Sequence, residues 1–401
     1  MIRDNRVARL VLAVALAAPL AATHPSPALA ERESAPAIPN LAGKVLTVTG
    51  PVDPSALGLT LMHEHVFIDF KTPPPMKPAP TGISVLRPPQ PEAPPEPAAA
   101  GDRAERRRGG GGLTDYAVSL AEVMEFKKAG GGTIVDVSNF GLTRDPDALL
   151  RVAKDSGLKL VMGAGWYMKT LHPPDMSERS VLELQDIVVR DIAVGAQGTS
   201  VRSGIIGEVG TGAFGDKGPL TDNELKSIRA SARASRLTGA PIMIHSFAPA
   251  DELQRALDIV AAEGVALDHV VMAHTGRGDV AAMKRFTDRG AYVEFDFMGQ
   301  APGTMGADGS LEQSAERIAA AIKTLIDAGL TERILVSHDV CIPGQLKKNG
   351  GGGFTFVPTM VVPALKARGV SDAAIRSILV ENPRRVLTFA APQPLVPAPA
   401  R

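Results

Sequence analysis

The sequence predicts a single-domain α/β protein built as a parallel (β/α)8 TIM barrel. From residue 113 onward, short apolar β-rich runs alternate with helical stretches, and eight strand-like runs are present in the chain. Strands alternating with helices build a parallel sheet, and eight parallel strands close into a barrel that side chains can fill. The rival fold, a doubly wound open sheet, is disfavoured because no glycine-rich phosphate loop follows the first strand.

Each predicted strand is a short apolar run that ends in small or polar residues. The eight runs are 59–62, 133–137, 158–163, 204–208, 241–245, 270–274, 291–296 and 334–337. Three intervening helices are expected from their composition and from the Asp residues at or near their starts, at 222–238, 250–263 and 279–289. They end near Gly239, Gly264 and Gly290, as helices that stop at a glycine do.

The composition restricts the class of function. The chain has 401 residues, of which 44% are hydrophobic, so it is long enough to bury a large core. Its 43 basic and 43 acidic side chains balance, which argues against a nucleic-acid partner. Cys341 is the only cysteine, so the chain can form no intramolecular disulfide, and any metal site must use histidines and carboxylates.

The first thirty residues are typical of a cleavable signal peptide. Arginines at positions 3, 6 and 9 precede the apolar run 10–22, and Ala28-Leu29-Ala30 follows it. A membrane anchor is the alternative, but a spanning helix needs roughly 20 apolar residues. We therefore expect a secreted or periplasmic protein that begins near Glu31 and has no membrane span after cleavage. N-terminal sequencing checks this, and an exported protein that keeps Met1 would contradict it.

A second unusual segment, 72–112, interrupts the barrel pattern. It has eleven prolines between Pro73 and Pro97, then three arginines at 106–108 and four glycines at 109–112. Such a composition offers little apolar surface to offset the entropy of ordering, which predicts a disordered insertion. The alternative is a lid over the active site, because the segment follows the first strand.

Six metal-binding side chains are placed at or just beyond the ends of predicted strands. His63 and His65 follow the first strand with one residue between them, so they share one face. The others follow strands four, five, six and eight, and they are Glu208, His245, His274 and Asp339. Four histidines and two carboxylates suit two divalent ions bridged by a carboxylate. The alternative is a set of separate histidines that bond to the backbone.

The remaining histidines and the cysteine do not fit this arrangement. His24 lies in the signal peptide, His269 precedes its strand, and His338 is next to a predicted ligand and so faces the opposite way. His172 lies in a loop and its role stays open. Cys341 is not expected to be a nucleophile, because no histidine base remains once the metal ligands are assigned.

Motifs at 48–51, 61–65, 133–137, 144–146, 162–167 and 381–387 resemble those of the phosphotriesterase-related branch of the amidohydrolase superfamily. That branch includes phosphotriesterases and lactonases, and the resemblance covers residues 45–389. It implies a barrel with a two-metal centre. His63, His65 and Asp339 would hold the buried ion, and His245 and His274 would hold the outer one.

Two positions depart from the pattern of phosphotriesterases. Their bridging ligand is a carboxylated lysine, whereas this chain has Glu208. Their proton relay uses a histidine and an aspartate, whereas the matching positions here are Phe297 and Arg277. These differences favour lactones or carboxylic esters over organophosphates as substrates.

The predicted activity is hydrolysis by a hydroxide shared between two divalent ions, with zinc expected and manganese, cobalt or iron as alternatives. Asp339 is the candidate acid/base, or else a ligand only. Tyr167 and Arg277 are candidate substrate-binding residues. The partner is a small-molecule substrate, and a homodimer is left open. A phosphotriester hydrolase and a non-catalytic metal-binding barrel are the competing interpretations.

Overall fold

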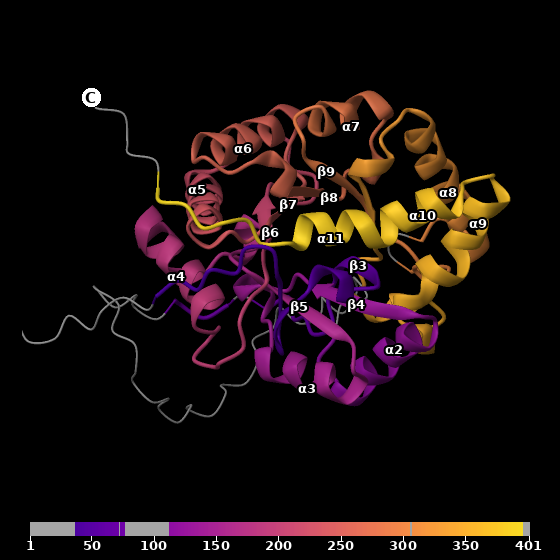
Figure 1. The fold of residues 1–401 in the computed structure, drawn as a ribbon, viewed down its shortest axis with the longest axis horizontal. Coiled ribbons are helices and arrows are strands. Elements are labelled where there is room, and N and C mark those ends of the chain that lie inside the picture. Colours follow the sequence, from indigo (N-terminus) through magenta and orange to yellow (C-terminus); the bar gives the residue numbers. More distant parts are fainter. Residues whose placement is uncertain (1–36, 72, 77–111, 305–306, 396–401) are drawn as a thin grey trace, which may run out of the picture.

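The computed structural model describes residues 37–71, 73–76, 112–304 and 307–395, and it confirms the predicted barrel (Figure 1). Eight strands, all parallel, follow one another around the sheet in chain order. They are β3 (Leu59–Glu64), β4 (Gly131–Asp136), β5 (Lys159–Ala164), β6 (Ile205–Thr211), β7 (Ile242–Ser246), β8 (Val270–Ala273), β9 (Tyr292–Phe295) and β10 (Ile334–Val336). Every predicted strand is present, and their ends differ from the prediction by at most three residues.

Helices surround the strands on the outside of the barrel (Figure 1). They are α2 (Tyr116–Lys128), α3 (Pro146–Ser156), α4 (Val181–Ala193), α5 (Asp222–Thr238), α6 (Ala250–Ala262), α7 (Val280–Thr287), α8 (Leu311–Asp327), α9 (Val362–Ala367), α10 (Asp372–Arg376) and α11 (Asn382–Leu387). The predicted helix 222–238 is α5, and the other two predicted helices are α6 and α7. Thr221 and Glu224 form a capping box at the start of α5, and Gly239 ends it in a left-handed conformation.

The barrel closes where its first strand meets its last. The backbone N–H of Asp339 donates to the His63 carbonyl at 2.9 Å, and the His63 N–H donates to Ser337 Oγ at 2.9 Å. Glu64, fully buried on β3, accepts hydrogen bonds from the Ser337 hydroxyl and from the N–H groups of His338 and Val340. This carboxylate therefore fixes the loop after β10, which carries Asp339.

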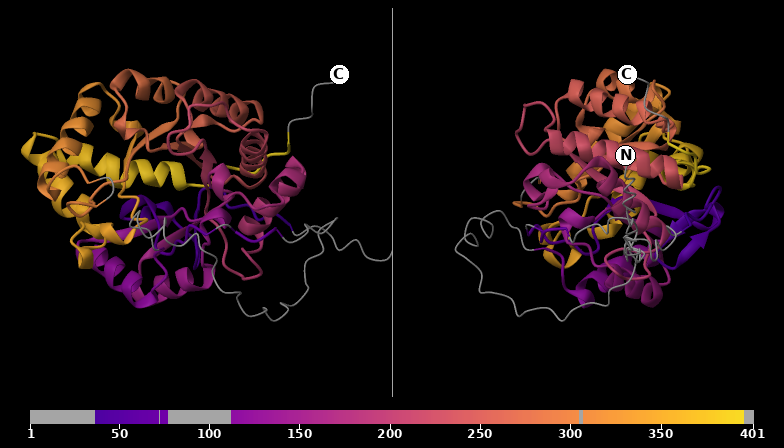
Figure 2. Two further views of the ribbon diagram at one scale, coloured as in Figure 1. Left: turned by 180° about the vertical axis from the view of Figure 1, so that it is seen from behind. Right: turned by 90° about the vertical axis from the view of Figure 1, so that its left-hand side faces the viewer.

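Apolar side chains fill the barrel interior. Met62, Val135, Val161, Met243 and Val271 belong to one cluster of buried residues. The same cluster includes residues of α11, which crosses the end of the barrel where the strands begin (Figure 1). The hairpin of β1 (Val45–Thr47) and β2 (Gly50–Val52), indigo in Figure 2, also packs at that end. The opposite end of the barrel, where the strands end, carries the predicted metal ligands.

Two features predicted from the sequence lie wholly or mostly outside the described residues. These are the signal peptide 1–30 and most of the insertion, which is described only at 73–76 and 112. Met76 is buried, and its backbone contacts the side chains of Asp175 and Arg179. Ile68 and Leu113 form an isolated bridge, so the insertion departs from and returns to one point beyond β3. No helix in the described ranges is long and apolar enough to cross a bilayer.

Candidate metal centre

The six predicted ligands gather at the ends of the strands, as the prediction of a metal centre requires. His63 lies in β3 and His65 directly follows it, because the strand ends at Glu64. The register of β3 against β4 is irregular between Leu61 and Glu64. Such an irregularity, like a β-bulge beside an active site, re-aims side chains. It explains why His63 faces the centre of the site although the adjacent Met62 packs in the barrel interior.

The other four predicted ligands come from four other strands or from the residues that follow them. Glu208 lies in β6 and His245 lies in β7, while His274 and Asp339 follow β8 and β10. His274 and Asp339 both adopt left-handed backbone conformations, with φ of 59° and 53°. Non-glycine residues rarely adopt this conformation, and it concentrates at functional sites. The chain therefore turns sharply where it presents these two side chains.

Glu208 is the centre of the arrangement. Its Oε1 lies 3.4 Å from His65 Nε2, and its Oε2 lies 3.2 Å from His63 Nε2. The same Oε2 lies 3.6 Å from His274 Nε2 and 3.7 Å from His245 Nε2. Two sets of potential ligand atoms therefore share this carboxylate, His63 and His65 on one side and His245 and His274 on the other. In each set the ligand atoms lie within 4.8 Å of one another.

Asp339 completes the first of these two sets. Its Oδ1 lies 3.3 Å from His65 Nε2 and 3.8 Å from His63 Nε2. Its residue is 6% exposed, whereas Glu208 is 1% exposed. Of the two carboxylates predicted to be ligands, Asp339 is therefore the one with more access to solvent.

The donor atoms of this site fit divalent metal ions. His63 Nε2, Glu208 Oε2 and His274 Nε2 are buried, and none forms a hydrogen bond of acceptable geometry in the described structure. Buried polar atoms without partners are costly, and all three of these face one another. Imidazole nitrogens and carboxylate oxygens are typical ligands of zinc and of neighbouring transition metals. Metal ions held between them would satisfy the unpartnered atoms.

Three of the histidines are oriented by acceptors on their Nδ1 side. His63 Nδ1 lies 3.3 Å from Glu294 Oε2, and His274 Nδ1 lies 2.6 Å from Asp296 Oδ1. His65 Nδ1 lies 2.9 Å from Ser138 Oγ, whose own hydrogen is donated to a backbone carbonyl. Each Nδ1 therefore carries a hydrogen, and Nε2 is the ring nitrogen that can bind a metal.

His245 is held differently. Its Nε2 lies 3.1 Å from the Tyr167 hydroxyl, and its Nδ1 is buried without a hydrogen-bond partner in the described structure. Tyr167, one of the two predicted substrate-binding residues, is thus buried against a predicted metal ligand. Arg277 is the other predicted substrate-binding residue, and its side chain lies outside the described part of the structure.

Burial and the neighbouring charges shift the pKa values of carboxylates and histidines in this site. Burial would raise the pKa of Glu208, but His245 and His63 outweigh this and hold that pKa well below its usual range. Burial would lower the pKa of His274, but the adjacent Asp296 outweighs it and raises that pKa to about 10. Burial lowers the pKa of His245 to about 3. Glu208 is thus ionised, and a metal binding at His274 Nε2 would displace a proton.

Glu294 and Asp296 were not identified in the sequence analysis. They lie on the predicted strand 291–296 with one residue between them, so they share a face. That alternation of acidic residues within an apolar run was the signal for their role. Asp296 also forms a possible three-residue ligand set with His63 and His274. Because its 2.6 Å contact with His274 Nδ1 is a hydrogen bond, we assign it to orienting His274.

The residues set aside in the sequence analysis lie as follows. Both ring nitrogens of His338 are bonded, Nδ1 to Glu64 at 2.6 Å and Nε2 to the Val357 N–H at 2.9 Å. His338 therefore has no ring nitrogen available to bind a metal ion. Burial, with Asp339 beside it, raises the pKa of the Cys341 thiol well above its usual range, which disfavours a thiolate nucleophile. His172 is half-buried outside the ligand sets, and burial lowers its pKa.

Replacing Asp296 with asparagine should weaken divalent metal binding by roughly 10- to 100-fold. Asp296 accepts from His274 Nδ1 with one oxygen and from the His274 backbone N–H with the other, at 2.8 Å. An amide would place its NH2 group against one of these donors. Titration against a chromogenic chelator measures the affinity. Asp279→Asn at the start of α7 keeps its helix cap and should bind metal normally; equal affinities in both variants would contradict the role of Asp296.

Comparisons with known proteins identify relatives of this chain. The family model described as "Phosphotriesterase family" matches residues 43–387. The human N-acetyltaurine hydrolase is 33% identical over 364 residues, which cover 87% of this chain and 99% of that relative. A resiniferatoxin-binding protein from Rhodobacter sphaeroides has a similar structure, with a TM-score of 0.70 and 34% identity. The match covers 87% of this chain and 96% of that protein. The Escherichia coli phosphotriesterase homology protein, complexed with phosphate in its active site, matches with a TM-score of 0.66 and 27% identity. This match covers 84% of this chain and 100% of that protein.

Proposed function

The chain belongs to the phosphotriesterase family, and from this premise we propose that it is a hydrolase with two divalent metal ions that cleaves small carbonyl compounds. The observation that supports this proposal most is the position of Glu208 between two sets of histidines. His63, His65 and Asp339 would hold one ion, and His245 and His274 the other. Glu208 would be the ligand that the two ions share, where the phosphotriesterases that the sequence resembles use a carboxylated lysine.

When bound, divalent ions such as zinc would supply Lewis-acid chemistry, which activates a water and polarises a carbonyl oxygen. The chain supplies the proton transfers. Asp339 Oδ1 lies among the ligand atoms and its residue retains some exposure, so it can accept a proton from the attacking water. It then delivers this proton to the leaving atom of the substrate.

Tyr167 is the candidate for orienting the substrate. Burial, reinforced by Glu208 and Asp339, raises the pKa of its hydroxyl well above the usual range, so the hydroxyl stays neutral. A neutral phenol can donate a hydrogen bond to a carbonyl oxygen. Its contact with His245 Nε2 places this donor beside the ligands proposed for the second ion.

We propose acyl compounds as the substrate class. Lactones and carboxylic esters are the substrates that the sequence favours, because Phe297 and Arg277 replace the proton relay of phosphotriesterases. The human relative, by its name, hydrolyses N-acetyltaurine, which is an N-acyl amide. Lactones, carboxylic esters and N-acyl amides are all hydrolysed by attack on an acyl carbon. Phosphotriesters are the second candidate, since the Escherichia coli neighbour accommodates phosphate in its active site.

A matched panel of substrates tests this proposal. It comprises N-acetyltaurine, a γ-lactone, 4-nitrophenyl acetate and diethyl 4-nitrophenyl phosphate, each measured at the same metal loading. At least one carbonyl compound should turn over faster than the phosphotriester. If the phosphotriester is faster than every carbonyl compound, the proposed substrate class is wrong. Absence of any metal-dependent turnover would instead favour the non-catalytic barrel.

An aromatic row beside the site predicts a preference for longer acyl groups. The Phe247 ring centroid lies 4.2 Å from that of His245, and the Phe214 centroid lies 4.5 Å from that of Phe247. Phe214 is 71% exposed. Each methylene laid on this row should raise kcat/KM, up to about fourfold if fully buried, from roughly 0.8 kcal/mol per CH2. Acetyl, propionyl and butyryl substrates measure this slope.

Phe214→Ala should flatten the dependence on acyl length, because it shortens the apolar row. Leu182 on α4 offers a matched control, since it is also apolar and 57% exposed but does not belong to the row. Leu182→Ala should keep the wild-type slope. Equal slopes in wild type and Phe214→Ala would show that substrate chains do not contact the row.

A further inference from the structure

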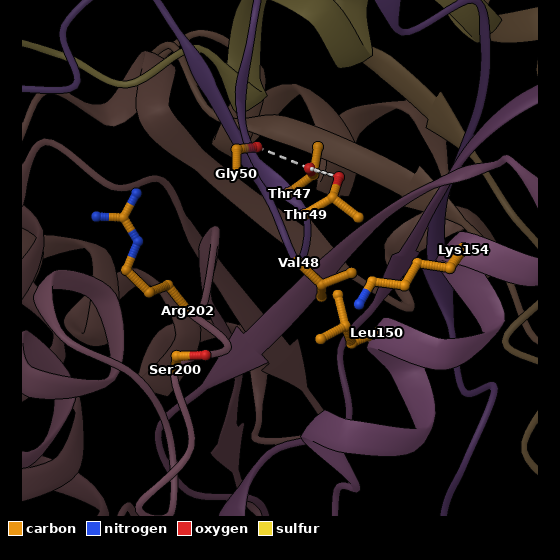
Figure 3. A pocket seen from close by; sticks show the side chains of 8 residues that line it. All are labelled: Thr47, Val48, Thr49, Gly50, Leu150, Lys154, Ser200 and Arg202. Atoms are coloured by element: carbon orange, nitrogen blue, oxygen red, sulfur yellow. Dashed lines mark hydrogen bonds between the residues drawn. The ribbon is translucent and has the colours of Figure 1, made fainter.

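A cavity of about 310 Å³ is lined by the β1–β2 hairpin, by α3 and by Ser200 and Arg202 (Figure 3). Lys154 of α3 is its second cationic residue, but the Arg202 guanidinium points away from Lys154 (Figure 3). The two cations therefore do not converge on one ligand. A much closer set of contacts lies at the opposite end of the barrel, around the backbone of Tyr167.

The Tyr167 backbone lies directly on Gly210 of β6. A Cβ atom at position 210 would be 2.3 Å from the carbonyl carbon and oxygen of Tyr167, and 2.4 Å from the Met168 nitrogen. Atoms in contact are normally 3.5 to about 4 Å apart. The φ of Gly210 is not in the left-handed region, so its backbone conformation suits other residues as well. Position 210 therefore needs glycine for space, and Tyr167 occupies that space.

Gly210 also lies beside His245, a predicted ligand. The two residues are register partners in the β6–β7 pair. The Gly210 N–H donates to the Trp166 carbonyl at 3.0 Å, which holds the loop after β5 against β6. From there the Tyr167 ring reaches His245, with 4.7 Å between the ring centroids and 3.1 Å between the hydroxyl and Nε2. The contact of the Tyr167 backbone with Gly210 thus sets where the hydroxyl lies.

The loop after β4 closes the other side of Tyr167. A Cβ atom at Gly141 would be 3.0 Å from Tyr167 Cβ and 3.1 Å from the Tyr167 backbone nitrogen. The fully buried Asn139 fixes this loop, because its Oδ1 accepts from the Gly141 N–H at 3.0 Å and its Nδ2 donates to the Glu208 carbonyl at 2.6 Å. Gly141 and Gly210 therefore bound a narrow slot for Tyr167, and Asn139 ties this slot to Glu208.

We propose that Gly210 is a positioning residue: it leaves the space in which the Tyr167 backbone lies, and so holds the Tyr167 hydroxyl beside the ligands of the second ion. This inference rests on the proposed function, in which that hydroxyl orients a substrate carbonyl. A side chain at position 210 would push the Tyr167 backbone out of the slot. The hydroxyl would then move, and a displacement of about 1 Å is enough to slow an enzymatic reaction.

Trp166 tests the placement without any substrate. It is the only tryptophan of the chain, and its carbonyl accepts from Gly210. In protein labelled with 5-fluorotryptophan, Gly210→Ala should shift the single fluorine NMR resonance. Gly218→Ala is the control and should leave the resonance unchanged, because a Cβ atom there would meet only the end of the Asp216 side chain, at 3.2 Å. An unchanged resonance in folded Gly210→Ala would overturn the proposal, whether or not the chain is a hydrolase.

Kinetics with the fastest carbonyl substrate of the panel test the positioning role. Tyr167→Phe should lower kcat/KM by roughly tenfold, because one hydrogen bond to the substrate is lost. Gly210→Ala should lower kcat/KM by a similar factor, but by less than about twofold in the Tyr167→Phe background, where the hydroxyl is already absent. Equal factors in both backgrounds would overturn the proposal, since a merely structural defect lowers both. Metal content should equal that of wild type in every sample.

A second variant covers the case in which Gly210→Ala does not fold. Gly141→Ala crowds Tyr167 from the other side of the slot, and its loss of kcat/KM should also disappear in the Tyr167→Phe background. A loss that persists there would refute the slot as the means of positioning Tyr167. Absence of turnover by wild type would reject the proposed function instead, and the fluorine resonance would still decide whether Gly210 places this loop.

Discussion

Glu208→Ala should abolish hydrolysis and remove at least one divalent ion from each chain. The carboxylate lies 3.2 to 3.7 Å from all four histidines predicted to be ligands. Without it, two cations would lie close together with no anion between them. Loss of the Lewis-acid contribution, worth several kcal/mol, corresponds to a fall in kcat/KM of about 10³-fold or more.

Metal analysis and activity must be measured on the same preparations. Wild type expressed with zinc or manganese should hold two ions per chain, and Glu208→Ala one or none. Glu316→Ala, which removes an exposed carboxylate from α8, is the control and should retain both ions. A wild type that never binds more than one ion would rule out the two-metal proposal. A Glu208→Ala variant with two ions would refute the bridging role alone.

The strand order and the positions of the six predicted ligands could be predicted because both depend on local pattern. Each ligand follows an apolar run, and in a parallel barrel all such runs end on the same side. Topology therefore brings together the strand ends that carry His63, His65 and Glu208. The β1–β2 hairpin was not predicted, because its strands have only three residues each and offer little periodicity to detect.

The contacts that orient the ligands could be read only from the structure. Glu294 and His63 are 231 positions apart, and Ser138 and His65 are 73 apart. Which acceptor meets which Nδ1 depends on strand register, and β3 and β6 both have irregular registers near their ligands. With regular alternation along β3, the adjacent side chains of Met62 and His63 would point to opposite faces, whereas both are found on the inner side of the barrel. Such local departures from the ideal pattern are typical of functional sites.

Asp339→Asn should lower kcat by roughly 10² to 10⁴, the usual contribution of a general acid/base. The amide cannot accept the proton of the attacking water, so the leaving atom would depart without one. The loss should therefore depend on the leaving group. Hydrolysis of 4-nitrophenyl acetate, whose phenolate leaves readily, should fall less than hydrolysis of methyl acetate or N-acetyltaurine.

This dependence separates the two roles of Asp339, since it is also placed to bind a metal ion beside His63 and His65. A variant that only lost a ligand would lower every rate by a similar factor, in proportion to its lost metal. A variant that lost the proton donor would keep its metal and discriminate by leaving group. Metal content, measured on each sample, shows which case holds. An equal loss for every substrate, with full metal occupancy, would exclude proton delivery by Asp339. Loss of proton delivery predicts a larger fall for substrates with poorer leaving groups.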